Sequence, residues 1–210
     1  MSPSRKKPAT AAKAVASKKR APVKVAKPVA AAARAPATKQ ARAPRTVAEF
    51  MVVALVMESE AAQRYAEFAD AMEMHNNREV AELFRRMAVI ESKHATQIME
   101  EMGWEKTPPL PFGVPVWDGF EAPETAPIDE VHYLMQPYHA LELALANEQR
   151  AERFYGQLAR VARTESVRKA ARELEAEERE HVELVRTWMA KVPKPDVDWA
   201  NDPDPPSYTD

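Results

Sequence analysis

Two Glu-x-x-His sequences, Glu91–His94 and Glu178–His181, carry the clearest chemical signal in the chain. Residues three positions apart lie side by side on a helix, so each pair presents one carboxylate and one imidazole to the same space. Oxygen and nitrogen ligands without thiolate suit iron or manganese, and zinc less specifically. We therefore regard both pairs as candidate metal ligands.

Each pair has a counterpart glutamate on the preceding helical segment, Glu58 for the first pair and Glu148 for the second. Together with Glu91 and Glu178 they fall in apolar stripes, where a carboxylate is costly unless it is paired or binds a cation. One glutamate on each of two helices and Glu-x-x-His on each of the other two is the ligand pattern of two-metal helix bundles. The pattern predicts two iron ions, with manganese as the alternative.

A tyrosine follows each counterpart glutamate by seven residues: Tyr65 follows Glu58, and Tyr155 follows Glu148. Either these tyrosines pack in the core and hydrogen-bond a ligand carboxylate, or they take part in a redox reaction. We include both, with the four glutamates, among the candidate catalytic residues. The common spacing in the two halves is a weak internal repeat, as expected of a bundle with approximate two-fold symmetry.

Apolar residues at spacings of three and four predict the helices that carry these side chains. Thr46 fits the N-cap of the first helix, with Glu49 at the capping-box position, and Gly103 is a natural stop for the second. For the third helix two starts are open, since Pro137 fits either a first turn or a kink. The four helices are expected at about 46–76, 78–102, 128 or 137 to 163, and 165–191.

The Pro-rich segment 104–127 joins the second and third helices. A helix of 25 residues is about 37 Å long, and this 24-residue connection can span that distance. Such a crossover would bring both Glu-x-x-His pairs to the same height. The expected fold is therefore all-α, a four-helix bundle over 47–192 built from two antiparallel hairpins.

The two ends of the chain differ in charge from the predicted bundle. Residues 1–46 contain 13 Lys/Arg and no Asp/Glu, which leaves 17 Lys/Arg against 32 Asp/Glu in the remainder. We expect a disordered basic tail over 1–46 and an acidic Pro-rich tail over 193–210. The basic tail either binds nucleic acid or another acidic partner without reading sequence, or only aids solubility. A gel shift of full-length and 47–210 protein at rising salt would separate these roles.

Composition excludes several other classes of protein. The chain has no cysteine, so disulfides, thiolate metal sites and thiol catalysis are excluded. No apolar run approaches the roughly 18 residues of a membrane helix, and the basic tail lacks the apolar region of a secretory signal. We therefore expect a cytoplasmic protein without a membrane span.

Two stretches resemble the rubrerythrin-like branch of the ferritin-like superfamily. Residues 140–155, ALELALANEQRAERFY, are similar to the third helix of that family, and residues 83–94, LFRRMAVIESKH, are similar to the second. The resemblance covers about residues 46–191. It implies a ferritin-like bundle, a di-iron centre and a homodimer. It also implies that Glu91 and Glu178 bridge the metals while Glu58 and Glu148 are terminal ligands.

The chain departs from that family at two points. Classical rubrerythrins carry a further glutamate three residues after the third-helix ligand, where this chain has Ala151. Glu152, one position on, is the candidate to replace it. A Cys-based rubredoxin domain is missing, so electrons must come from an external donor or from iron itself.

Three functions follow from these patterns. The first is a di-iron peroxidase or oxidase that reduces hydrogen peroxide or oxygen. The second is ferrous iron oxidation and iron handling. The third is a protective protein that associates with DNA or another polyanion through residues 1–46.

Overall fold

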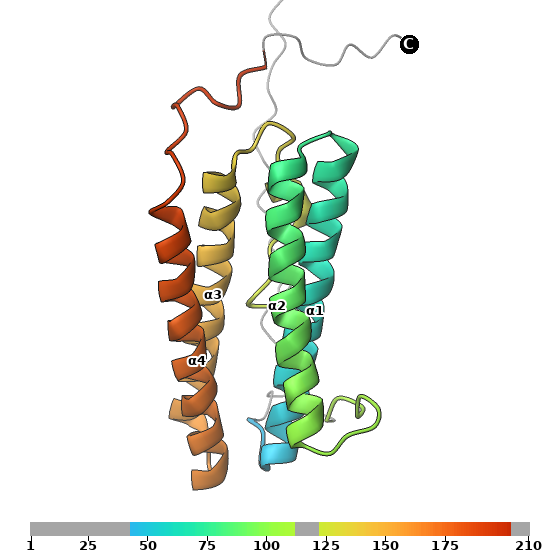
Figure 1. Ribbon diagram of the computed structural model, residues 1–210. Helices are drawn as coiled ribbons and strands as arrows, with labels where there is room; N and C mark the ends of the chain where they lie inside the picture. Colours follow the sequence, from blue (N-terminus) through green and yellow to red (C-terminus); the bar gives the residue numbers. More distant parts are fainter. Residues whose placement is uncertain (1–42, 112–121, 203–210) are drawn as a thin grey trace, which may run out of the picture. The chain divides into compact units, whose positions relative to one another are not determined.

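A computed structural model of the chain describes residues 43–111 and 122–202. These residues contain no β-strand, and they form four long α-helices and one short 3-10 turn, η1 (Ile128–Glu130). The expected all-α four-helix bundle is confirmed. Figure 1 shows the helices in two antiparallel hairpins. The four are α1 (Val47–Met74), α2 (Arg78–Glu101), α3 (Pro137–Val161) and α4 (Glu165–Met189).

Parts of three predicted segments lie outside the described residues. They are most of the predicted basic tail 1–46, the middle of the crossover 104–127 and the end of the acidic tail 193–210. Within the described ranges, none of the helices is both long and apolar enough to cross a membrane.

Local signals in the sequence explain where α1 begins and where α2 ends. Thr46 Oγ1 accepts a hydrogen bond from the Glu49 backbone N–H at 3.1 Å, as expected of an N-cap. The Glu49 carboxylate accepts from the N–H of Arg45 at 2.8 Å, one residue further out than in a standard capping box. Gly103 follows α2 with φ of +65°, a conformation that glycine adopts without strain.

The third helix begins at Pro137, the later of the two predicted starts. Gln136 is extended, with φ −105° and ψ 165°, because the residue before a proline is disfavoured in a helix. Pro137 itself loses nothing at this position, since the first N–H groups of a helix have no partner within it. The connection between α2 and α3 is therefore longer than the predicted 104–127, and η1 is a separate turn within it.

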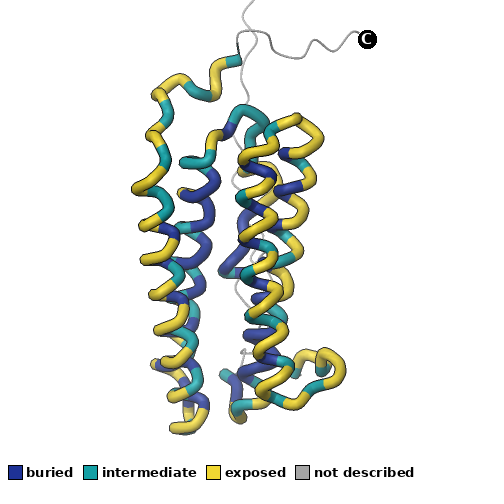
Figure 2. The backbone as a smooth tube through the Cα atoms, in the orientation of Figure 1, coloured by how far each residue is buried: buried dark blue, intermediate teal, exposed yellow. Residues whose placement is uncertain are grey.

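The buried faces of the two hairpins are turned toward each other, as Figure 2 shows. The apolar core lies there in two clusters. One surrounds Tyr65, Phe84 and Leu141, near the turn between α1 and α2. The other surrounds Phe50, Tyr155 and other residues toward the opposite end of the helices. The four predicted glutamates lie between the clusters along their helices, so a polar layer divides the core.

Candidate metal centre

Each of the four helices contributes one glutamate to this polar layer. Glu58 comes from α1, Glu91 from α2, Glu148 from α3 and Glu178 from α4. All four side chains are buried, with at most 2% of each residue exposed. Charged groups at such depth require compensation by partners of opposite charge.

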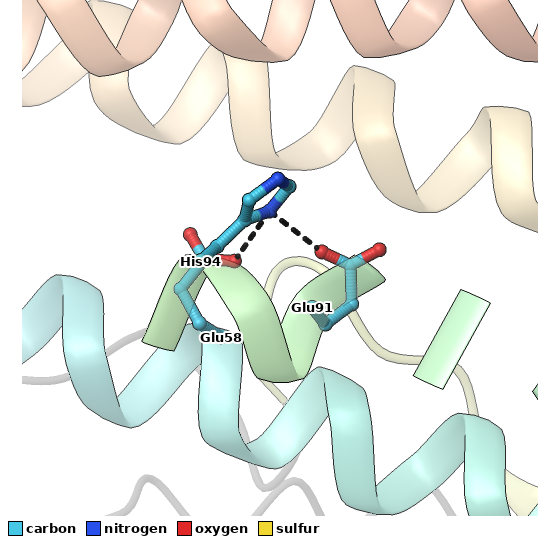
Figure 3. Close-up of side chains that lie close together, drawn as sticks. All are labelled: Glu58, Glu91 and His94. Carbon is cyan, nitrogen blue, oxygen red and sulfur yellow. Dashed lines mark hydrogen bonds and ion pairs between the residues drawn. The ribbon is translucent and has the colours of Figure 1, made fainter. Parts of the chain in front are cut away.

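The first hairpin brings Glu58, Glu91 and His94 together, as Figure 3 shows. His94 Nδ1 lies 3.1 Å from Glu91 Oε2 and 3.5 Å from Glu58 Oε2. One ligand atom from each of the three residues lies within 4.8 Å of the others, so the group is able to hold a metal ion. The i, i+3 spacing on α2 and the pairing with α1 produce this geometry.

The second hairpin repeats the arrangement with Glu148, Glu178 and His181. His181 Nδ1 lies 3.3 Å from Glu178 Oε2 and 3.6 Å from Glu148 Oε2. The rings of His94 and His181 stack with their centroids 4.6 Å apart and their planes 3° from parallel. The two triads are therefore neighbours, and the six residues form one candidate site for two ions.

Several carboxylate oxygens in this layer lack a hydrogen-bond partner among the described residues. They include Glu91 Oε1, and Glu58 Oε2 and Glu148 Oε2, whose contacts with His94 and His181 are ion pairs longer than a hydrogen bond. A buried acceptor without a partner is unfavourable and uncommon in native proteins. Metal cations would satisfy these oxygens, and carboxylate with imidazole is a donor set that suits iron. The residues present therefore fit a two-metal centre.

Burial and crowding change the acidity of the carboxyl groups. Burial raises the pKa of Glu91 to about 7, and repulsion from Glu148 and Glu58 adds to the effect, although the hydrogen bond with His94 opposes it. Burial likewise raises the pKa of Glu178 well above its usual value. Without metal, each of these two carboxyl groups therefore binds a proton more tightly than an exposed glutamate does.

The pKa values of the two histidines are also raised, but for a different reason. Burial lowers the pKa of each imidazole, but hydrogen bonds and the negative charge of the two glutamates in its own triad outweigh burial. The pKa of His94 rises to about 10, and that of His181 rises to about 11. Protons therefore stabilise the metal-free site, and metal ions must displace them in order to bind.

The two predicted tyrosines are both buried, but their hydroxyl groups have different partners. Tyr155 donates to Glu58 Oε1 at 3.3 Å, across the two hairpins. Tyr65 instead accepts from Asn147 Nδ2 at 3.0 Å. Burial raises the pKa of both phenols well above 10. Both tyrosines are therefore neutral hydrogen-bonding groups near neutral pH, and only Tyr155 hydrogen-bonds a site carboxylate.

Glu152, the predicted replacement for the missing third-helix glutamate, lies apart from both triads. Its Oε1 accepts from Arg179 Nε at 3.0 Å, and it belongs to none of the metal-binding groups in the described residues.

A residue that the sequence analysis did not predict lies in the polar layer. Glu124 of the crossover is fully buried and within ligand distance of glutamates of both triads. Its sequence context, Ala-Pro-Glu-Thr-Ala-Pro, has no helical period that would have marked it.

A cavity of about 230 Å³ reaches the histidine side of the centre between α2 and α4. It gives small molecules a route to the site, because exposed residues line it together with ligand candidates. The residues around it include Glu58, His94, Glu178 and His181 at the site, and the exposed Gln97, Glu101, Glu177 and Glu180.

The chain matches a family model described as rubrerythrin over residues 49–110 and 139–202. These ranges contain both triads, whereas Glu124 lies between them. Among solved structures, an uncharacterized conserved protein from Magnetospirillum magnetotacticum MS-1 is 36% identical, with a TM-score of 0.54. The match covers 72% of this chain and 99% of that chain. The curated proteins contain no significant match.

Proposed function

The chain belongs to the rubrerythrin family, and from this premise we propose that it is a di-iron oxidoreductase that reduces hydrogen peroxide or oxygen. The observation that supports the proposal most is the pair of adjacent Glu/Glu/His triads, buried between two apolar clusters. Bound there, two iron ions would supply the two electrons that peroxide reduction requires, one from each ion. An external donor would return these electrons.

The protein contributes binding, orientation and access. The six triad residues provide the ligands, and the Tyr155 hydroxyl orients Glu58 by its hydrogen bond. The apolar clusters above and below exclude water from most of the site. The cavity beside the histidines is the entry for a small oxidant.

Metal loading and peroxide turnover test this proposal together. Anaerobic addition of ferrous iron should give close to two ions per chain, with peroxide consumption. Glu91→Ala and Glu178→Ala should each lose turnover, because each removes a buried ligand. Glu173→Ala, an exposed glutamate of the same helix as Glu178, is the matched control and should keep activity. A wild-type protein that binds no iron and gains no thermal stability from it would contradict the proposal.

Ferrous iron as the substrate is a second candidate, and the mouth of the cavity favours it. Glu101, Glu177 and Glu180 line the mouth, while no Lys or Arg is among its lining residues in the described part of the chain. A cleft with one sign of charge concentrates ions of the opposite sign. If Fe²⁺ is the substrate, the double variant Glu101→Gln/Glu180→Gln should slow oxygen-dependent iron oxidation. It should leave peroxide consumption by the iron-loaded protein unchanged, because peroxide is neutral.

A further inference from the structure

The crossover between α2 and α3 brings a fifth carboxylate into the polar layer. Glu124 has no exposed surface, and neither of its oxygens has a hydrogen-bond partner among the described residues. We propose that Glu124 is a fifth carboxylate ligand of the two-metal centre, supplied by the crossover and not by a helix. The inference deepens the proposed function and rests on its two-metal site.

Glu124 lies close to glutamates of both triads. It forms one group of possible ligands with Glu58 and Glu178, and another with Glu91 and Glu148. In each group the ligand atoms lie within 4.8 Å of one another. Glu124 is therefore within reach of ions on either side, between carboxylates from all four helices.

The backbone on both sides of Glu124 is held in place by Arg150 of α3. Arg150 donates to the carbonyl of Pro123 from Nε and to the carbonyl of Thr125 from Nη2, each at 2.8 Å. The same guanidinium donates to Asn147 Oδ1, and Asn147 in turn donates to Tyr65. A planar fork with several donors suits this fixed arrangement. The clamp makes Arg150 a positioning residue for Glu124.

The segment also packs along the core on either side of the polar layer. Ala122 belongs to the apolar cluster around Phe50, and Ala126 belongs to the cluster around Tyr65. Glu124 lies between these two anchors in the sequence. Figure 1 shows this part of the crossover (yellow) running along the helices toward the start of α3. The segment thus passes the centre from one cluster to the other.

Nothing in the described protein compensates the burial of this carboxyl group. Burial raises its pKa well above the usual value, and repulsion from the four helical glutamates adds to the effect. A neutral side chain of similar size would satisfy packing without this penalty. Retaining a carboxylate there makes physical sense if a cation binds to it.

Charge balance indicates what a fifth carboxylate would change. Four carboxylates match the charge of two ferrous ions, +4, whereas two ferric ions carry +6. A fifth carboxylate therefore stabilises the oxidised pair more than the reduced pair. Ala151 provides no carboxylate one turn after Glu148, and Glu152 is paired with Arg179. Among the residues that the structure describes, Glu124 is the one placed to supply this fifth carboxylate.

The test compares Glu124→Gln with Glu152→Gln, which removes the other candidate for a fifth carboxylate. Binding of Co²⁺ and Fe²⁺ to the full-length protein would be measured by calorimetry and by the visible spectrum of the cobalt form. Glu124→Gln should weaken binding of at least one ion by about 10-fold or more, alter the cobalt spectrum and raise the reduction potential of the iron form. Glu152→Gln should match wild type in all three.

The outcomes separate this inference from the proposed function. If wild type binds two ions and Glu124→Gln has the same affinities, spectrum and potential, Glu124 is not a ligand. If wild type binds no metal, the proposed two-metal function fails as a whole. Circular dichroism checks that the helices persist. Should Glu124→Gln fail to fold, Glu124→Asp keeps the charge with a shorter reach. A wild-type cobalt spectrum and wild-type affinities in Glu124→Asp would likewise overturn the inference.

Discussion

At the scale of single residues, the two halves of the site are similar but not equivalent. Both triads contain two glutamates and a histidine whose Nδ1 lies near both carboxylates. The tyrosines break this symmetry, because Tyr155 contacts Glu58 while Tyr65 contacts Asn147. Equivalent spacing in the sequence therefore does not produce equivalent hydrogen bonds.

This difference predicts unequal effects of removing the two hydroxyl groups. Tyr155→Phe should reduce metal affinity about 10-fold, because it removes a hydrogen bond that orients a ligand carboxylate. Tyr65→Phe, the matched control, should change metal affinity little, since its partner is an amide. Calorimetric titration with Co²⁺ measures both. Equal losses in the two variants would contradict the asymmetry.

At the scale of elements, the helices and the crossover depend on different interactions. The helices begin and end at local signals such as the Thr46 cap and Pro137. The crossover near Glu124 depends on Arg150, which is 25 and 27 residues away from its two partners in the sequence. A change at Arg150 should therefore affect the crossover while the helices remain intact.

Arg150→Lys tests this dependence, because lysine lacks the planar fork that contacts two carbonyl groups. Loss of hydrogen bonds worth about 1–2 kcal/mol should increase local opening by roughly 10-fold. Limited proteolysis should then cut faster within 103–136, with helical circular dichroism unchanged. Arg153→Lys, an exposed arginine on the same helix, is the control and should show wild-type cleavage. Unchanged cleavage in Arg150→Lys would show that other contacts hold the crossover.

At the scale of the whole molecule, the metal-free protein should respond to pH through the site. Glu91, His94 and His181 all have raised pKa values in the folded state. A raised pKa means that the folded state binds protons more tightly than the unfolded chain, so stability falls as pH rises. For Glu91 the loss occurs between about pH 4.5 and 7, and for the histidines between about pH 6.5 and 10 or 11.

We therefore expect the melting temperature of the metal-free protein to fall by several degrees from pH 5 to pH 8. Scanning calorimetry in the presence of a chelator measures this change. Glu91→Gln should have a flatter profile below pH 7, because the titrating group is absent. The stabilisation by added iron should increase over the same range, since metal ions compete with protons. A metal-free melting temperature that rises with pH, with the same slope in Glu91→Gln, would contradict this account.

The homodimer, the cytoplasmic location and the binding of polyanions through residues 1–46 stay predictions. Light scattering of the full-length protein measures its mass in solution and so tests the predicted homodimer. The net charge of the remaining chain is strongly negative, with 17 Lys/Arg against 32 Asp/Glu. The basic tail and the acidic remainder are therefore expected to differ in their partners.

Most of the fold was predictable from local patterns along the chain. Helical periodicity placed Glu58, Glu91, Glu148 and Glu178 on apolar faces, and the structure buries all four. The caps and prolines located the helix ends within a few residues. These predictions succeeded because a helix is specified by interactions between residues three or four positions apart.

The tertiary structure alone decided the parts of the site that come from outside the helices. Neither the position of Glu124 nor its clamp by Arg150 has a local pattern, because a Pro-rich segment has no period and its path depends on distant contacts. The tertiary structure also decided that Glu58 is the carboxylate that Tyr155 contacts, because the two residues are 97 positions apart. The sequence by itself determined which carboxylates and imidazoles the four helices would bring together. Packing of the crossover against α3 determined that a fifth carboxylate joins them.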